Sequence, residues 1–587
     1  MNNKRRKFIL LCGITAILCT LGVMQIHLST LENQTIDEGV HLSAGYSYLV
    51  TGDHRLNPEH PPFAKQLAAI PLLFIRPDMP TDHVSWQQAD QYEFAQQFLY
   101  ESGNNPDQLM FWGRFPIILL TLLLGILIAR WAYEYAGWLG AYAATLLYAT
   151  SPIILAHGHL VTTDIPVALG ITATIYFLQK SIQNKNTKWL VFTALSFAFA
   201  VNVKFTGLIL AGIIPIIYVF LLKKRSKYPH IGVRHFFTFV LITLAITILF
   251  TLLTTSFITQ KFGDDTVQSI ERVERLSQIF NESQGIRKLY VGAYIFGLES
   301  VTFPAYPYFN GLLLFLEHSY FGHESFFLGE YSDTGNPWYF PLAFFIKTPL
   351  AIVILLFLLI LYGLRKSIVT IRLHAIQNTF LKSIRRWLSS YTLNGIVFAG
   401  VPILYLLLAM NSHVNLGVRH LIPVFPFIFI GITRLAHEDV IRKKILKYIF
   451  GIIFIIGITA PFMVYPYPLA YYSEIIGGSS NGHKYIMDSN IDWGQNLKHF
   501  KSYLEANNNP RVCLHYFGKG NPEYEGIDSQ PLPSREDVEL GMNIDCLAAI
   551  SVQLLYDRGN TYEWLREYTP TDIIGYGLYL YDFRRSY

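Results

Sequence analysis

Apolar runs long enough to cross a lipid bilayer as helices recur along most of the sequence. The apolar core of a bilayer is about 30 Å thick, and an α-helix needs roughly 20 residues to cross it. A helix also satisfies its own backbone hydrogen bonds, which a chain inside the bilayer must do. The sequence predicts about eleven such helices, over residues 8–31, 111–132, 138–157, 165–181, 188–203, 205–222, 235–257, 339–363, 391–411, 420–436 and 446–466.

The composition agrees with this class of protein. Hydrophobic residues make up 52% of the 587 residues and charged residues only 15%, whereas an ordinary soluble domain carries about 25% charged residues. We therefore expect a polytopic α-helical membrane protein, and an ordinary soluble enzyme is excluded. The first apolar run follows the basic segment NKRRK and is too long for a signal peptide, so it predicts a retained first helix.

The charges in the loops predict the orientation. Lys and Arg gather in alternate loops, whereas Leu31 to Met110 holds eleven Asp and Glu against three Lys and Arg. Because basic loops stay on the cytoplasmic side, we place the N-terminus there and the loops 32–110 and 258–338 outside. A transmembrane domain over residues 1–466 would then precede a soluble extracytoplasmic domain over residues 467–587. The expected location is the inner (plasma) membrane, in contact with its lipids, and nothing predicts binding of nucleic acid.

Shorter apolar stretches and the C-terminal region predict the outer structure. FAKQLAAIPLLFI, VGAYIFGLESVTF and YFNGLLLFLEHSYF are too short to span and predict helices along the membrane surface. The C-terminal region predicts a small α/β module, with a helix in WGQNLKHFKSYLEAN and strands in RVCLHYFG, CLAAISVQLLY and IIGYGLYLYDF. Cys513 and Cys546 lie there, and either a disulfide or two free thiols fits the sequence.

Two acidic positions stand at the predicted outer ends of helices. Asp37, with Glu38 beside it, follows the first apolar run, and Asp164 lies in HGHLVTTDIPVAL. Each has a structural interpretation as a helix cap that also favours the helix dipole. The functional interpretation is a partly buried carboxylate that takes a proton from an acceptor hydroxyl. Because the two acids share one predicted level, we expect them to form one site.

Cationic side chains are predicted at the same level. Lys65 follows EHPPF, Lys204 lies in an outer turn, and Arg419 precedes His420. A single interfacial Lys often only extends its charge towards water. Together with His60, however, these residues predict a grip for a phosphate or pyrophosphate, in which Arg can form two parallel hydrogen bonds.

Histidines also gather in the predicted outer loops. A set of His, Glu and Asp side chains can bind a divalent metal ion, and His60 and His323 are the candidate ligands. No spacing between them is diagnostic of a metal site, so the sequence leaves a metal cofactor open.

A polar segment, DSNIDWGQN, begins the C-terminal region. Its aromatic and amide groups would suit a sugar. The alternative is a structural helix start in which Asp492 is the cap. The sequence favours the structural interpretation and leaves sugar binding open.

Five sequence blocks together resemble the dolichyl-phosphate-mannose–protein mannosyltransferase-like superfamily, which includes aminoarabinose transferases and bacterial envelope glycosyltransferases. The blocks are DEGVHLSAGYSYLVTGDHRLNPEHPPFAKQLAAIPLL, LVTTDIPVAL, GHESFFLGEYSDTGNPWYFPLAFFIKTPL, NLGVRHLIPVFPFIF and DSNIDWGQNLKHFKSYL. The resemblance implies a GT-C fold and an inverting transfer of a sugar from a polyprenyl-phosphate carrier. It implies that Asp37 is the base, Asp164 an orienting group or metal ligand, and Lys65 a neighbour of the lipid phosphate.

The expected function is therefore a glycosyltransferase of the outer membrane face that uses a polyprenyl-phosphate-linked sugar. The acceptor is an envelope glycan, lipid or protein that the sequence does not identify. Two other classes stay open: a transporter or flippase of the lipid-linked sugar, and a non-catalytic envelope scaffold. Transport sites usually place ionisable groups near the middle of the bilayer, whereas the polar groups here gather at predicted helix ends.

Overall fold

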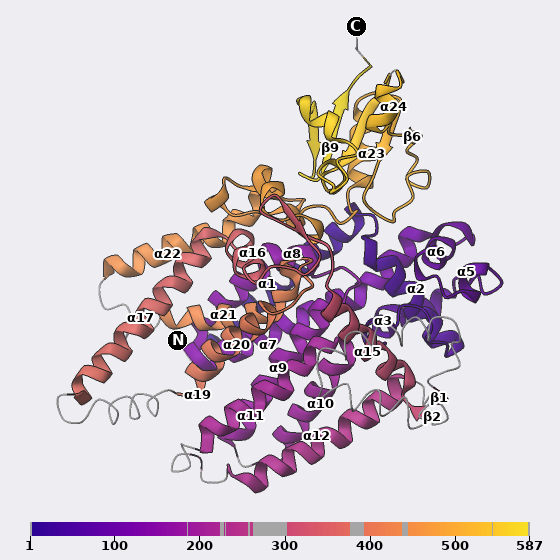
Figure 1. Ribbon diagram of the computed structural model, residues 1–587. Coiled ribbons are helices and arrows are strands. Elements are labelled where there is room, and N and C mark those ends of the chain that lie inside the picture. Colours follow the sequence, from indigo (N-terminus) through magenta and orange to yellow (C-terminus); the bar gives the residue numbers. More distant parts are fainter. Residues whose placement is uncertain are drawn as a thin grey trace.

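The computed structural model describes residues 3–184, 186–222, 228, 231–255, 259–261, 302–375, 392–436, 444–542 and 544–584. Helices dominate the part preceding the C-terminal sheet (Figure 1), and eight of them are long and apolar enough to cross a membrane. These are α1 (Asn3–Leu31), α7 (Pro106–Ala149), α9 (Asp164–Gln183), η2 with α11 (Phe205–Leu222), α12 (Val233–Thr254), α17 (Leu350–Ala375), η5 with α21 (Val418–Ile432) and α22 (Lys444–Thr459). The expected class, a polytopic helical membrane protein, is confirmed.

The helices follow the eleven predicted runs with three local differences. Helix α7 covers one predicted run and the start of the next, with a break at Ala136–Gly137, where Gly137 has a φ of 73° that favours glycine. The run 339–363 divides into α16 (Tyr339–Lys347) and α17, because Pro349 cannot donate the next helical hydrogen bond. Two further apolar helices, Lys188–Val203 (α10) and Leu393–Ala409, are shorter. The number of membrane crossings stays a prediction.

Two helices form the centre of the bundle. The apolar window of α9 is 83% buried and that of Val418–Leu435 is 89% buried, whereas the window of α17 is 11% buried. Core residues come from several elements: Leu28, Leu42, Ile117, Ile165 and Leu421. The most buried helices, α9 and α21 with its leading turn η5, are also those whose first residues reach the candidate site.

Short helices follow α1 and α7. They are α2 (Ile36–Thr51), α3 (Phe63–Ala69), α4 (Leu72–Ile75), α5 (Val84–Gln87), α6 (Gln91–Gln96), η1 (Gln97–Glu101) and α8 (Pro152–His157). Of these, α2, α3, α5 and α6 lie on one side of the bundle (Figure 1). The predicted surface helix at 63–75 is present but divides between α3 and α4. Helix α3 packs closely on α2 at Gly45. A larger residue would not fit there, because its Cβ would lie 2.2 Å from the carbonyl oxygen of Lys65.

The second predicted outer loop is described only in part. It contains β1 (Thr259–Lys261) paired with β2 (Thr302–Pro304), the predicted helix as α15 (Tyr306–Phe321), and the hairpin of β3 (Ser325–Phe327) and β4 (Glu330–Ser332). Residues 262–301, including most of VGAYIFGLESVTF, lie outside the described residues. So do residues 223–227, 376–391 and 437–443 of the predicted basic loops.

The C-terminal region contains the expected α/β module, drawn in yellow in Figure 1. Its sheet has the order β6-β5-β7-β9-β8, with β5 parallel to both neighbours and β7 antiparallel to β9. The strands are β5 (Val512–His515), β6 (Ser529–Pro531), β7 (Leu547–Ser551), β8 (Asp572–Ile574) and β9 (Leu578–Asp582). Helix α23 (Leu497–Ala506) packs on the sheet through Leu497, Phe500 and Leu504.

Two details of the module differ from the sequence prediction. The single strand expected in IIGYGLYLYDF is a hairpin of β8 and β9, with Gly575 at φ 57° in the turn. The strand expected in CLAAISVQLLY ends at Ser551, and α25 (Val552–Leu555) follows. Between the two cysteine alternatives, the structure has the disulfide: Cys513 on β5 bonds to Cys546 just before β7.

The disulfide gives a direct prediction. Protein prepared from membranes without reductant and then denatured should react with a maleimide at two cysteines, Cys12 and Cys19, which are free. After reduction all four should react, as counted by the mass shift. Cys513→Ser is the control and should expose a third reactive thiol without reduction. Four reactive thiols in the unreduced wild type would contradict the bond.

Candidate active site

Asp37 lies in the first turn of α2 but does not cap the helix. Thr35 precedes the helix, and its backbone N–H donates to Oε2 of Glu38 at 3.0 Å, so Glu38 supplies the capping contact. Asp37 is left with 28% of its side chain exposed. The cap interpretation of Asp37 is therefore wrong, and the residue presents a partly open carboxylate at a helix N-terminus, where the dipole favours negative charge.

Glu38 is fully buried, and both of its oxygens are occupied. Arg114 of α7 donates from Nε to Oε1 at 2.9 Å and from Nη2 to Oε2 at 2.7 Å, and the N–H of Val161 donates to Oε1 at 2.9 Å. Burial alone would raise the pKa of Glu38, but Arg114 and the backbone hydrogen bonds outweigh it and lower the pKa. Glu38 is therefore held by structural contacts, and its expected role as a catalytic acid beside Asp37 stays a prediction.

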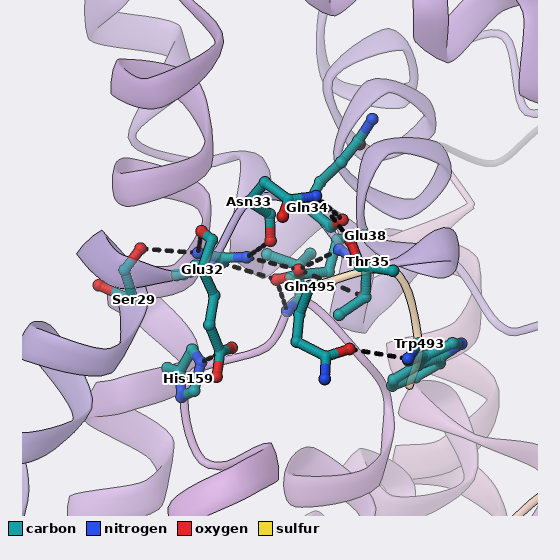
Figure 2. A network of polar contacts seen from close by, with 12 residues as sticks. Ser29, Glu32, Asn33, Gln34, Thr35, Glu38, His159, Trp493 and Gln495 are labelled. Carbon is teal, nitrogen blue, oxygen red and sulfur yellow. Dashed lines mark hydrogen bonds and ion pairs between the residues drawn. The ribbon is translucent and has the colours of Figure 1, made fainter. Parts of the chain in front are cut away.

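Arg114 also joins the end of α1 to the start of α2. Its guanidinium donates to the carbonyl oxygens of Ser29 (2.7 Å), Glu32 (2.9 Å) and Asn33 (2.9 Å). Figure 2 shows Ser29, Glu32 and Asn33 in this region, and the carboxylate of Glu32 also reaches Nε2 of His159 at 2.9 Å. The backbone leading to Asp37 is therefore held by a buried, hydrogen-bonded charge pair rather than by loop contacts alone.

Asp164 is the first residue of α9 and is almost fully buried. Nζ of Lys204 lies 2.5 Å from Oδ1 of Asp164, and the two side chains are 7% and 2% exposed. Lys204 follows the last residue of α10, which packs along α9. Lys204 thus forms a buried ion pair, and the interpretation of an interfacial lysine reaching for water is wrong.

Arg419 joins the two acids. Its Nη1 lies 3.1 Å from Oδ2 of Asp37 and 3.7 Å from Oδ2 of Asp164. The structure therefore brings Asp37, Asp164, Arg419 and Lys204 into one chain of alternating charges, and the sequence had predicted these four residues at one level. We call these four residues the charge cluster. Their catalytic and binding roles stay predictions.

Buried polar atoms of the charge cluster are left without a hydrogen-bond partner. In the charge cluster these atoms are Oδ2 of Asp164 and Nε of Arg419. Nδ1 of His157 and Oγ1 of Thr162, which precede Asp164 in the sequence, also lack a partner. Buried polar groups in proteins nearly always have a partner, either protein or water. These atoms are therefore available to water or to the polar groups of a ligand.

Lys65 is placed differently from its predicted role beside a phosphate. It is 1% exposed, and its ammonium donates to the hydroxyl of Tyr48 (3.1 Å), Oδ1 of Asn57 (3.0 Å) and the carbonyl oxygen of His60 (3.0 Å). Burial lowers its pKa to about 7, an effect that Glu59 opposes. In this structure Lys65 holds the loop between α2 and α3, and its phosphate contact stays a prediction.

Two of the predicted histidines, His60 and His420, lie near the charge cluster. Burial, together with Lys204 and His41, holds the pKa of His60 well below its usual range, so its ring is neutral. His420 stacks against Phe340, with ring centroids 6.0 Å apart. Among the described residues, no group of three or more His, Cys, Asp and Glu side chains could hold a metal ion. A metal bound at His60 and His323 stays a prediction, and we route no step through one.

Sequence reasoning missed Arg114, and it missed the contact of Trp493 with Arg419. Arg114 lies inside a long apolar run, and an unpaired arginine there was a signal for a buried acidic partner. Trp493 is 2% exposed, and the guanidinium carbon of Arg419 lies 4.1 Å from its ring centroid.

The expected cap at Asp492 is wrong, because its Oδ1 accepts from the N–H of Gly494 and the helix begins later, at Leu497.

The difference in burial between Glu38 and its neighbour Asp37 can be tested by measuring the free energy of unfolding of two variants. Glu38→Gln should lower the free energy of unfolding by about 3–5 kcal/mol, because it leaves the Arg114 charge buried and unpaired. Asp37→Asn is the matched control and should change stability much less, since Asp37 is partly exposed. Thermal unfolding in detergent measures both. Equal, small shifts would contradict the structural role of Glu38.

Lys65 makes stability depend on pH. Between about pH 7 and 10.5 the unfolded chain keeps a proton on Lys65 that the folded protein has released. The free energy of unfolding should therefore rise with pH, by up to about 1.4 kcal/mol per unit. Lys65→Met should remove this slope when unfolding is followed from pH 7.5 to 9.5. Identical slopes in both proteins would mean that the ammonium stays charged.

Comparison with known proteins adds independent information. Residues 107–252 match the family described as dolichyl-phosphate-mannose-protein mannosyltransferase. A search of curated proteins finds no match. Two crystal structures of ArnT from Cupriavidus metallidurans align over 97% of both chains. The apo structure is 12% identical with a TM-score of 0.32, and the structure bound to undecaprenyl phosphate is 14% identical with a TM-score of 0.31.

The family match covers the segment that contains Asp164, Lys204 and the block LVTTDIPVAL. The other four blocks that carried the resemblance lie outside it. The match agrees with the helical architecture and indicates a membrane glycosyltransferase. Over residues 107–252, it confirms a resemblance of this chain to the dolichyl-phosphate-mannose–protein mannosyltransferases.

Proposed function

We propose that this protein is an inverting glycosyltransferase that moves a sugar from a polyprenyl-phosphate carrier to an acceptor hydroxyl on the extracytoplasmic face of the membrane. The observation that carries the proposal is the charge cluster, in which Arg419 contacts Asp37 and lies near Asp164 at the first turns of α2 and α9. The family match to residues 107–252 supports the same reaction class.

Asp37 is the proposed general base. Of the two acids, Asp37 has the more exposed side chain, 28% against 2% for Asp164. A base must come within hydrogen-bond distance of the proton it removes. Asp37 accepts the proton of the acceptor hydroxyl, and the oxygen attacks the anomeric carbon on the face opposite the phosphate. The carbon–oxygen bond to the phosphate breaks, and its electron pair leaves with the polyprenyl phosphate.

Arg419 is the proposed partner of the leaving phosphate. Two carboxylates and two cations balance the charge cluster before a ligand binds, and the buried Nε of Arg419 has no partner. A phosphate can therefore take that donor while Asp164 remains paired with Lys204. As the bond to the sugar breaks, negative charge grows on the phosphate, and a fixed guanidinium stabilises it more in the transition state than before.

The sidedness of the reaction follows from the proposed topology. The charge cluster lies at the ends of the helices that are predicted to face outward, and the C-terminal module contains a disulfide, which is typical of an oxidising compartment. The N-terminus would be cytoplasmic and the protein would lie in the inner membrane. The acceptor is an envelope glycan, lipid or protein.

The transporter and scaffold alternatives make different predictions. A transporter needs a polar path through the bilayer, whereas the charge cluster lies at helix N-termini. A scaffold needs no partly exposed acid held against an arginine. The charge cluster thus favours an enzyme over either class.

Activity can be followed as release of polyprenyl phosphate from sugar-labelled polyprenyl-phosphate hexoses and pentoses, with envelope extract as acceptor. Asp37→Asn should lower the rate by about 100-fold or more, because a general base contributes 10²–10⁴-fold. Asp53→Asn is the matched control: its side chain is 27% exposed and pairs with Arg55 at 2.8 Å, away from the charge cluster.

Three results would contradict the proposal. Full activity in Asp37→Asn would exclude this residue as the base. Movement of labelled lipid between leaflets of a vesicle without release of polyprenyl phosphate would identify a transporter. Absence of both movement and release, across all donors offered with the wild-type protein, would favour a scaffold.

A further inference from the structure

The first part of the C-terminal region lies against the charge cluster rather than apart from it. Short 3₁₀ turns, among them η8 (Pro468–Ala470) and η11 (Asp488–Asn490), lead from the last apolar helix to α23. We refer to residues 488–496, DSNIDWGQN, as the DWGQ segment. One of its contacts reaches the side chain of Arg419, and two reach the backbone of the residues that precede Asp37 and Arg419.

Trp493 contacts Arg419 and the residue that precedes Asp37. The guanidinium carbon of Arg419 lies 4.1 Å from the Trp493 ring centroid. The carbonyl oxygen of Trp493 accepts a hydrogen bond of 3.1 Å from the N–H of Ile36, the residue before Asp37. Figure 2 shows Trp493 next to the start of α2. There the side-chain oxygen of Gln495 accepts a hydrogen bond of 2.7 Å from the backbone N–H of Trp493.

Asn490 holds the other side of the pair. Its Oδ1 accepts from the N–H of Val418 at 2.9 Å, one residue before Arg419. Its side-chain nitrogen Nδ2 donates to the hydroxyl of Tyr339 at 3.1 Å, and its backbone carbonyl oxygen accepts from Nζ of Lys347 at 2.6 Å. Asn490 is 0% exposed, so its amide is fixed by buried hydrogen bonds on both ends.

The DWGQ segment is in turn anchored to the end of α1. Nδ2 of Asn33 donates to the carbonyl oxygen of Gly494 at 2.6 Å, and Oδ1 of Asn33 accepts from the N–H of Leu497 at 2.8 Å. Arg114 also donates to the backbone carbonyl oxygen of Asn33. The segment therefore bridges the α1–α2 junction and the turn η5, which are far apart in sequence.

We propose that Trp493 is a positioning residue for the reaction, and that the DWGQ segment completes the active site by fixing Arg419 relative to Asp37. This inference rests on the proposed function. The aromatic face attracts the guanidinium and excludes water from one side of it. Arg419 then presents its in-plane N–H groups towards Asp37 and an incoming phosphate without having to reorient during the reaction.

The test compares Trp493→Leu and Trp493→Phe with a matched control, Trp131→Leu. Trp131 is equally buried at 2% exposed and donates to Gln179 within α7–α9, away from the charge cluster. Trp493→Leu should lower kcat about 10-fold, within the range expected for loss of a desolvated cation–π contact. Trp493→Phe should recover most of the rate, and Trp131→Leu should keep kcat while losing comparable thermal stability.

A second measurement asks whether Trp493 acts through Arg419. In an Arg419→Lys background the planar guanidinium is gone, so adding Trp493→Leu should lower kcat by less than about 3-fold. An undiminished 10-fold loss there would overturn the inference, because the tryptophan would then act independently of the arginine. Equal kcat losses in Trp493→Leu and Trp131→Leu would overturn it as well.

Asp37→Asn, measured in the same series, separates the two levels of the proposal. If Asp37→Asn is inactive while Trp493→Leu has the kcat of the wild type, the positioning role alone is wrong. If Asp37→Asn is fully active, the proposed function at the charge cluster fails, whatever the tryptophan variants do.

Discussion

A single guanidinium, that of Arg419, sits between two carboxylates that the chain brings in from different helices. Charges removed from water are stable only when they are paired and hydrogen-bonded, because the desolvation of an isolated ion costs several kcal/mol. Asp164, Lys204 and Arg419 are all nearly buried, so each depends on the others. The position of Asp37, the one partly exposed member, is then set by the same arginine.

The surrounding fold places these charges where helices begin. The N-termini of α2 and α9 and the turn η5 converge, and their dipoles favour the two acids. A second buried pair, Glu38 with Arg114, holds the start of α2. The DWGQ segment contacts Arg419 through Trp493 and the preceding residue, Val418, through Asn490. The Glu38–Arg114 pair therefore holds the backbone near the site and is buried, whereas the Asp37–Arg419 pair lies in the site and is partly exposed.

The sequence predicted those features of the site that depend only on where helices end and which residues there are charged. Apolar runs predicted the helices, and their outer ends predicted that Asp37, Asp164, Arg419 and Lys204 would meet. It failed where a side chain's partner is decided by tertiary packing. Nothing local distinguishes Glu38, which is saturated by Arg114, from Asp37 beside it. Likewise Trp493 gave no local sign that it packs under an arginine from another segment, and Lys65 gave none that its ammonium would be enclosed by Tyr48 and Asn57.

The most direct measurement is a cryo-electron microscopy structure of the protein in a lipid nanodisc with polyprenyl phosphate bound. If the charge cluster is the reaction centre, the phosphate will contact Arg419, with the Asp37 carboxylate facing the same space and Asp164 still paired with Lys204. A phosphate bound elsewhere, or Asp37 and Asp164 on different sides of the helix bundle, would contradict the central claim.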